Sequence, residues 1–161
     1  MKTIPLSQGK SALVDDEDFE RLSQFRWRYF SKGRNEYAHC HSPMIQGKRS
    51  TLLMHRIVMR AVNGQEIDHR DNNGLNNQKS NLRFCNRSQN NGNMRVDPKS
   101  KTGFKGVRFI GNQPLNPWRA QLGFRGTLID LGSHPTAIAA AEAYNRAALK
   151  YFGEYAKVNK I

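Results

Sequence analysis

The sequence predicts an α+β protein made of short antiparallel strands and a few helices. Apolar and polar residues alternate in short runs such as 25–30 (FRWRYF) and 118–122 (WRAQL), a period typical of strands with one buried face. Residues 136–152 (TAIAAAEAYNRAALKYF) carry apolar side chains at helical spacing instead. Thr136 can cap this helix and Gly153 can end it. Both kinds of element are therefore expected.

Residues 1–95 are expected to form one domain that begins with a small antiparallel sheet. Asp15 or Asp16 can cap a helix with an acidic first turn, and this explains the acidic residues more simply than a catalytic carboxylate pair. Residues 51–59 (TLLMHRIVM) are mostly apolar and are expected to enter the core. The strands ahead of them are expected at residues 3–6, 12–14, 25–30 and 37–41.

Residues 66–93 have the element order strand, loop, strand and helix. Asp68 and His69 end the first strand, and a loop rich in Asn and Gly follows. Asp68 offers a hard oxygen ligand, His69 a base that can be neutral near pH 7, and Asn90 a carbonyl oxygen. These groups suit a divalent cation with an activated water, and hence metal-assisted phosphodiester hydrolysis.

A second domain is expected at residues 102–161, after a polar linker at 96–101. Its three short strands, separated by turns at 111–117 and 123–126, predict an antiparallel meander with one face covered by the helix that starts near Thr136. The opposite face and its margins would then present Lys105, Arg108, Arg119, Gln121 and Arg125.

Charge and composition favour a nucleic acid as partner. The 161 residues include 26 Lys and Arg against 13 Asp and Glu, a net charge of +13, which suits an anionic polymer. No apolar run approaches the ~18 residues that a spanning helix needs, and no secretory signal begins the chain. A cytoplasmic protein is expected, without membrane attachment or secretion. Cys40 and Cys85, without a CxxC pair, do not predict a thiolate zinc site.

Three further histidines have no role fixed by the sequence. His39 and His41 share one face of an expected strand and could bind a metal, but a third ligand is missing nearby. A solvated strand face explains them as well. His55 lies in the apolar run and is either a satisfied core histidine or a second functional histidine.

Four motifs stand in order along the first part of the chain: LMHR (53–56), IDHRDNNGLNN (67–77), NLRFC (81–85) and SQNNGN (88–93). They resemble the HNH endonucleases encoded by phages and mobile introns, which are homing endonuclease-like proteins. The resemblance implies a ββα-metal core at about residues 52–95. It also implies that in this core His69 is the general base and that Asp68 and Asn90 are the metal ligands.

The same resemblance assigns supporting roles. Asn81 matches the central Asn that ties the loop together, and His55 falls in the first motif as an auxiliary residue. The last motif member is Asn90, where many relatives have His. An Asn oxygen beside a carboxylate suits one Mg²⁺ ion, or Mn²⁺, better than zinc. Asn91 and Asn93 are close enough in sequence to be alternatives for this ligand.

Three further segments lie in the expected C-terminal domain: SKTGFKGVRF (100–109), WRAQL (118–122) and LGSHPTAIAAAEAYNRAALKYFGEYAKVN (131–159). They resemble the AP2 DNA-binding domain of plant transcription factors and mobile endonucleases. The resemblance implies a three-stranded sheet in the major groove, where Arg reads guanine and Gln reads adenine. Asp130 stands where plant relatives often have an aromatic residue, so this chain is not expected to recognise the DNA sequences that the plant proteins recognise.

Together these features predict a metal-dependent DNA endonuclease that hydrolyses phosphodiester bonds. Because a single HNH centre has one active site, a monomer on double-stranded DNA would most simply nick one strand. No small-molecule cofactor is expected. The expected setting is a bacterial or phage-infected host cell. Two alternatives stay open: a non-catalytic, sequence-specific DNA-binding regulator with a degenerate nuclease core, and an RNA-directed nuclease.

Overall fold

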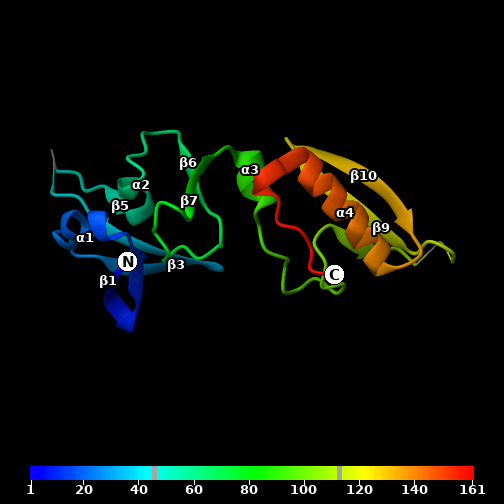
Figure 1. The fold of residues 1–161 in the computed structure, drawn as a ribbon, viewed down its shortest axis with the longest axis horizontal. Coiled ribbons are helices and arrows are strands. Elements are labelled where there is room, and N and C mark those ends of the chain that lie inside the picture. The colour runs from blue at the N-terminus through cyan, green and yellow to red at the C-terminus, as the bar shows by residue number, and fades with distance from the viewer. Residues whose placement is uncertain (45–46, 112–113) are drawn as a thin grey trace. The chain divides into compact units, whose positions relative to one another are not determined.

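The computed structural model describes residues 1–44, 47–111 and 114–161 and has the mixed α+β architecture that the sequence predicts (Figure 1). Residues 112–113 of the expected turn at 111–117 lie outside the described part. The chain divides into two compact units, Met1–Cys85 with small antiparallel sheets and Asn86–Ile161 with a three-stranded antiparallel sheet. None of the described helices is long and apolar enough to cross a membrane.

The first unit opens with a hairpin followed by a helix. Alternation places Ile4, Ala12 and Val14 in the core, where Leu22 of the helix joins them. The elements are β1 (Lys2–Pro5), the 3-10 turn η1 (Ser7–Gly9), β2 (Ser11–Val14) and α1 (Asp16–Ser23).

The helix α1 is tied to a distant loop through its acidic residues. Asp15 holds the N-cap position of α1 without a side-chain cap bond. Its carboxylate accepts hydrogen bonds from the backbone N–H of Lys79, at 2.8 Å, and from the side chain of Gln78, at 3.1 Å. The acidic start of α1 therefore anchors the loop at residues 70–81.

A three-stranded sheet and a short helix follow. The prediction of a strand from residue 25 is wrong for residues 25–27, because Trp27 turns into the core and its indole N–H donates to the carbonyl of Leu22 at 2.7 Å. The apolar run 51–59 contains both a strand and a helix. The elements are β3 (Arg28–Lys32), β4 (Asn35–His41), β5 (Thr51–Leu53) and α2 (Met54–Val58), with the sheet order β3-β4-β5.

The first unit ends in a hairpin whose long loop packs on the rest of the unit. The backbone N–H of Leu13 donates to Leu75 O, and that of Asn77 donates to Leu13 O, both at 2.8 Å. Gly74 is required in this loop because a Cβ there would overlap the carbonyl oxygen of Glu36. The strands are β6 (Glu66–His69) and β7 (Leu82–Cys85).

The second unit contains a three-stranded sheet with a helix on one face (Figure 1). The hydroxyl of Thr136 accepts from the backbone N–H of Ala139 at 3.0 Å, and Gly153 ends the helix at φ 55°, as the sequence predicts. Tyr144 is buried against the sheet, whereas Tyr151, which helical spacing would place on the same apolar face, is 37% exposed. The elements are β8 (Val107–Phe109), β9 (Trp118–Phe124), β10 (Thr127–His134), α4 (Ala137–Phe152) and the 3-10 turn η2 (Gly153–Tyr155), with the sheet order β10-β9-β8.

The short helix α3 (Arg87–Gly92) belongs to this second unit. A capping box between Asn86 and Gln89 starts it. Gly92 lies so close to the ring of Phe152 that a Cβ would come within 2.7 Å of it. The linker proposed at residues 96–101 stays a prediction from the sequence.

Candidate active site

Asp68 and His69 lie side by side at the end of β6, both buried. Arg83 stands directly opposite Asp68 on β7. Its Nε and Nη2 both donate to Oδ2 of Asp68, at 2.9 and 2.8 Å, in an ion pair that is itself buried. Two charged donors on one oxygen fix the orientation of the carboxylate.

Burial sets the protonation state of His69. It lowers the pKa of the imidazole below its ordinary value, while the side chain of Asn77 and the carboxylates of Asp71 and Asp68 act in the opposite direction. The lower pKa favours the neutral ring near pH 7. A neutral imidazole is the form that can accept a proton from water.

His55 lies against His69, although the two residues come from different elements. Their rings are edge to face with centroids 5.1 Å apart, and Tyr37 contacts His55 with a centroid separation of 5.6 Å. Burial, together with the nearby His69 and Arg56, lowers the pKa of His55 to about 3. Among the described residues, no hydrogen-bond partner meets His55 Nδ1. His55 is thus a buried neutral neighbour of His69.

Asn81 braces the loop that follows His69. Its Oδ1 accepts from the backbone N–H of Asp71 at 3.1 Å. Its Nδ2 donates to Asp71 Oδ1 at 2.9 Å and to Asn76 O at 2.8 Å. These bonds close the turn after the Asp-His pair, and the role in the site that the resemblance implies for Asn81 stays a prediction.

Asn77 is a residue of this region that sequence reasoning missed. It is 1% exposed, and neither Nδ2 nor Oδ1 of its side chain forms a hydrogen bond with any described residue. It nevertheless lies close enough to His69 to favour the protonated ring. Its position in an Asn-rich loop resembles ordinary turn chemistry, so the sequence carried no separate signal for it.

Asn90 and its two alternatives all lie in or next to α3, in the second unit. Asn90 is half-buried, Asn91 is exposed, and Asn93 is buried at the C-cap of α3. The backbone N–H of Asn90 donates to Asn86 O at 3.0 Å within the helix. Asn90 therefore stays a sequence-based candidate for the distal ligand.

The donors of the candidate site fit a hard divalent ion. The resemblance assigns Asp68 and Asn90 as metal ligands, and a carboxylate and an amide oxygen are donors that Mg²⁺ and Mn²⁺ prefer. Hydrogen bonds such as those from Arg83 commonly orient a carboxylate that binds a metal. HNH nucleases typically use a divalent metal ion, and these residues offer the chemistry for one.

Other groupings in the described residues offer weaker metal sites. Asp15, Glu17 and Asp18 place their oxygens close together. Lys79 already pairs with Glu17 at 2.5 Å and with Asp18 at 3.2 Å, so this cluster is an ion-pair network. The rings of His39 and His41 lie 5.6 Å apart on β4, and within the described ranges no cluster of three ligands includes them.

The predicted DNA-binding residues of the second unit lie on and around its sheet. Arg108 and Arg119 are register partners on β8 and β9. Arg119 forms a two-bond fork with Asp130, with Nε to Oδ1 at 3.1 Å and Nη2 to Oδ2. The amine of Lys105 donates to Gly92 O at 2.6 Å. Arg119 and Lys105 thus already have protein partners, which sequence spacing did not reveal.

The comparisons with known proteins bear on the whole chain. No family model and no solved structure matches it. A protein of Acanthamoeba polyphaga mimivirus, described as an uncharacterized HNH endonuclease, is 38% identical over 160 residues, which cover 96% of this chain and 77% of the relative. Similarity at this level over nearly the full length shows common membership, and the chain belongs to the HNH endonuclease family.

Proposed function

We propose that this HNH endonuclease nicks double-stranded DNA with the help of one divalent metal ion, Mg²⁺ in first place and Mn²⁺ as the alternative. The observation that carries the proposal is the pairing of a neutral, buried His69 with the oriented carboxylate of Asp68 at the end of β6. Chemistry and family agree, since hydrolysis of a phosphodiester needs a base and a stabiliser of negative charge.

In the proposed reaction His69 accepts a proton from water as the water oxygen forms a bond to phosphorus. The bond from phosphorus to the 3′ oxygen then breaks. Asp68 and Asn90 would hold the metal ion, which when bound stabilises negative charge on the phosphate and the departing oxygen. Arg83 keeps the Asp68 carboxylate in place, and Asn81 keeps the loop after His69 closed.

The second unit is proposed to be an AP2-like module that supplies the DNA address, as in homing endonucleases. Its sheet, covered by α4 on one face, would meet the major groove with the other, through Arg108, Arg119 and Gln121, and Arg125 would contact the DNA from the margin of the sheet. Lys105 is assigned a different part, because its amine already donates to carbonyl oxygens of α3. We infer that Lys105 holds α3 in position. The protein would act as a monomer.

Conversion of supercoiled plasmid tests this proposal. With Mg²⁺ the purified protein should produce nicked circles before linear DNA, and EDTA should abolish the conversion. His41→Ala, a change at the exposed end of β4, is the matched control for His69→Ala and should leave the nicking rate unchanged. DNA binding without any cleavage in Mg²⁺ or Mn²⁺ would contradict the proposal and favour a DNA-binding regulator.

A further inference from the structure

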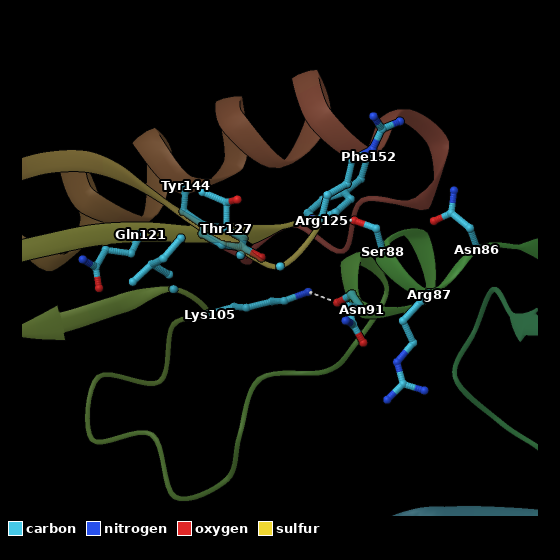
Figure 2. A pocket seen from close by; sticks show the side chains of 14 residues that line it. Asn86, Arg87, Ser88, Asn91, Lys105, Gln121, Arg125, Thr127, Tyr144 and Phe152 are labelled. Atoms are coloured by element: carbon cyan, nitrogen blue, oxygen red, sulfur yellow. Dashed lines mark hydrogen bonds between the residues drawn. The ribbon is translucent and has the colours of Figure 1, made fainter.

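The second unit contains a cleft of about 760 Å³ between α3 and the sheet (Figure 2). Residues at the start of α3 form one side, and the turn between β9 and β10 forms another. Tyr144 and Phe152 of α4 contribute apolar surface. The cleft joins two features that the sequence places far apart, namely the last HNH motif and the basic C-terminal sheet.

The charge of the cleft selects an anionic occupant. Arg87, Lys105 and Arg125 line it, and the described lining residues include no carboxylate. Amide groups of Asn86, Asn91 and Gln121 add donors. Positive charge with neutral donors and small apolar surfaces suits a sugar-phosphate chain, whose phosphates need cations and whose sugars can pack on apolar groups.

Arg125 occupies an unusual backbone position at the rim of this cleft. It forms the hairpin turn with Gly126, and the two residues have φ angles of 49° and 80°. Turns with two positive φ angles favour Asn-Gly, so an arginine at the first position is strained. Its backbone N–H also donates to the hydroxyl of Ser88, at 3.3 Å, which joins the turn to α3.

We propose that this cleft binds the sugar-phosphate backbone of one DNA strand, with Arg87 and Arg125 contacting different phosphates. In Figure 2 the guanidinium groups of Arg87 and Arg125 point in opposite directions, so they suit two separate phosphates better than one shared ion. The amine of Lys105 points to Asn91 and maintains the cleft from within.

This inference rests on the proposed DNA substrate and assigns a function to α3 that goes beyond the base contacts of the sheet. Arg87 and Asn90 lie on the same helix, one turn apart. A phosphate held by Arg87 would therefore keep the helix that carries Asn90 against the bound DNA. The contact is independent of sequence, since phosphates carry no base information.

The test measures binding to a short DNA duplex without metal, by fluorescence anisotropy, over a series of KCl concentrations. Each phosphate contact contributes ~0.9 to the slope of log affinity against log salt concentration. Arg87→Gln and Arg125→Gln should each weaken binding and should each reduce the magnitude of this negative slope by ~0.9. Lys150→Gln, which removes the same charge from the exposed part of α4, should leave the slope unchanged.

Arg125→Asn separates binding from folding. Because Asn suits this turn better than Arg, the variant should be at least as stable as the wild type while it binds DNA with the same reduced slope. Slopes equal to that of Lys150→Gln would overturn the inference, as would tighter binding to an RNA duplex of the same sequence. Reduced slopes in a protein that never nicks DNA would support the cleft and contradict only the proposed nuclease mechanism.

Discussion

The rings of His55 and His69 lie edge to face in the first unit, with their centroids 5.1 Å apart. Two imidazolium cations at this separation in a buried setting would repel each other strongly. The pKa of His55 is about 3, and burial also lowers that of His69. Burial therefore favours the neutral, basic form of His69 at neutral pH, with a neutral His55 beside it.

The first prediction concerns stability against pH. Between about pH 3 and the ordinary histidine pKa of ~6.5, the unfolded chain binds a proton at His55 that the folded chain does not. The free energy of unfolding should therefore fall as the pH drops from about 6.5. The urea midpoint should be lower at pH 5 than at pH 7.5, and His55→Gln should reduce this difference. His41→Gln should retain it in full; a full difference in His55→Gln would contradict the account.

The second prediction concerns the buried ion pair. Arg83→Leu leaves the Asp68 carboxylate buried without its two charged donors, which should cost about 3–5 kcal/mol of unfolding free energy. Adding Asp68→Asn removes the uncompensated charge, so the double variant should regain part of that loss. Urea unfolding of the single and double variants measures this. A double variant less stable than Arg83→Leu would show that the charge of Asp68 is not the cause.

The third prediction concerns the loop between β6 and β7. Gly74→Ala would place a methyl group on the carbonyl oxygen of Glu36, and relieving the overlap should destabilise the first unit by about 1–3 kcal/mol. Gly123→Ala in β9 is the matched control, since a Cβ there meets nothing within 4 Å. Thermal unfolding should separate the two variants by several degrees. Equal melting temperatures would argue against this tight packing.

The fourth prediction concerns the fork between Arg119 and Asp130. Asp130→Asn removes a negative charge beside the proposed DNA face and releases Arg119. DNA binding should tighten and its salt dependence should steepen by up to ~0.9. Glu142→Gln, on the exposed side of α4, changes net charge equally and should have a smaller effect. Weaker binding by Asp130→Asn would mean that Asp130 orients Arg119 for DNA.

Local sequence patterns predicted the helices and strands, but they did not predict which side chains contact each other across the fold. Alternation located β1, β2 and β9, and the cap at Thr136 and the stop at Gly153 bounded α4. Turn chemistry likewise marked the loop that Asn81 braces. These features depend on neighbours in sequence, which is why composition and spacing suffice for them.

The contacts that shape the candidate site depend on strand register and packing. Arg83 meets Asp68 only because their strands pair in one register, and His55 meets His69 only because the fold of the first unit brings a residue of α2 to the end of β6. The ion pair between Arg119 and Asp130 likewise depends on the pairing of their strands, β9 and β10. Trp27 left the expected strand because a buried indole needs an acceptor, here Leu22 O. Local patterns in a sequence do not reveal such long-range contacts, because strand register and packing determine them.

Single-turnover nicking of DNA that is already bound tests the central claim most directly. His69→Ala should bind the duplex with the affinity of the wild type, measured without metal, and then cut ~10²- to 10⁴-fold more slowly when Mg²⁺ is added, because it lacks the base. Unchanged nicking by His69→Ala under these conditions would contradict the assignment of His69 as the group that accepts the proton from water.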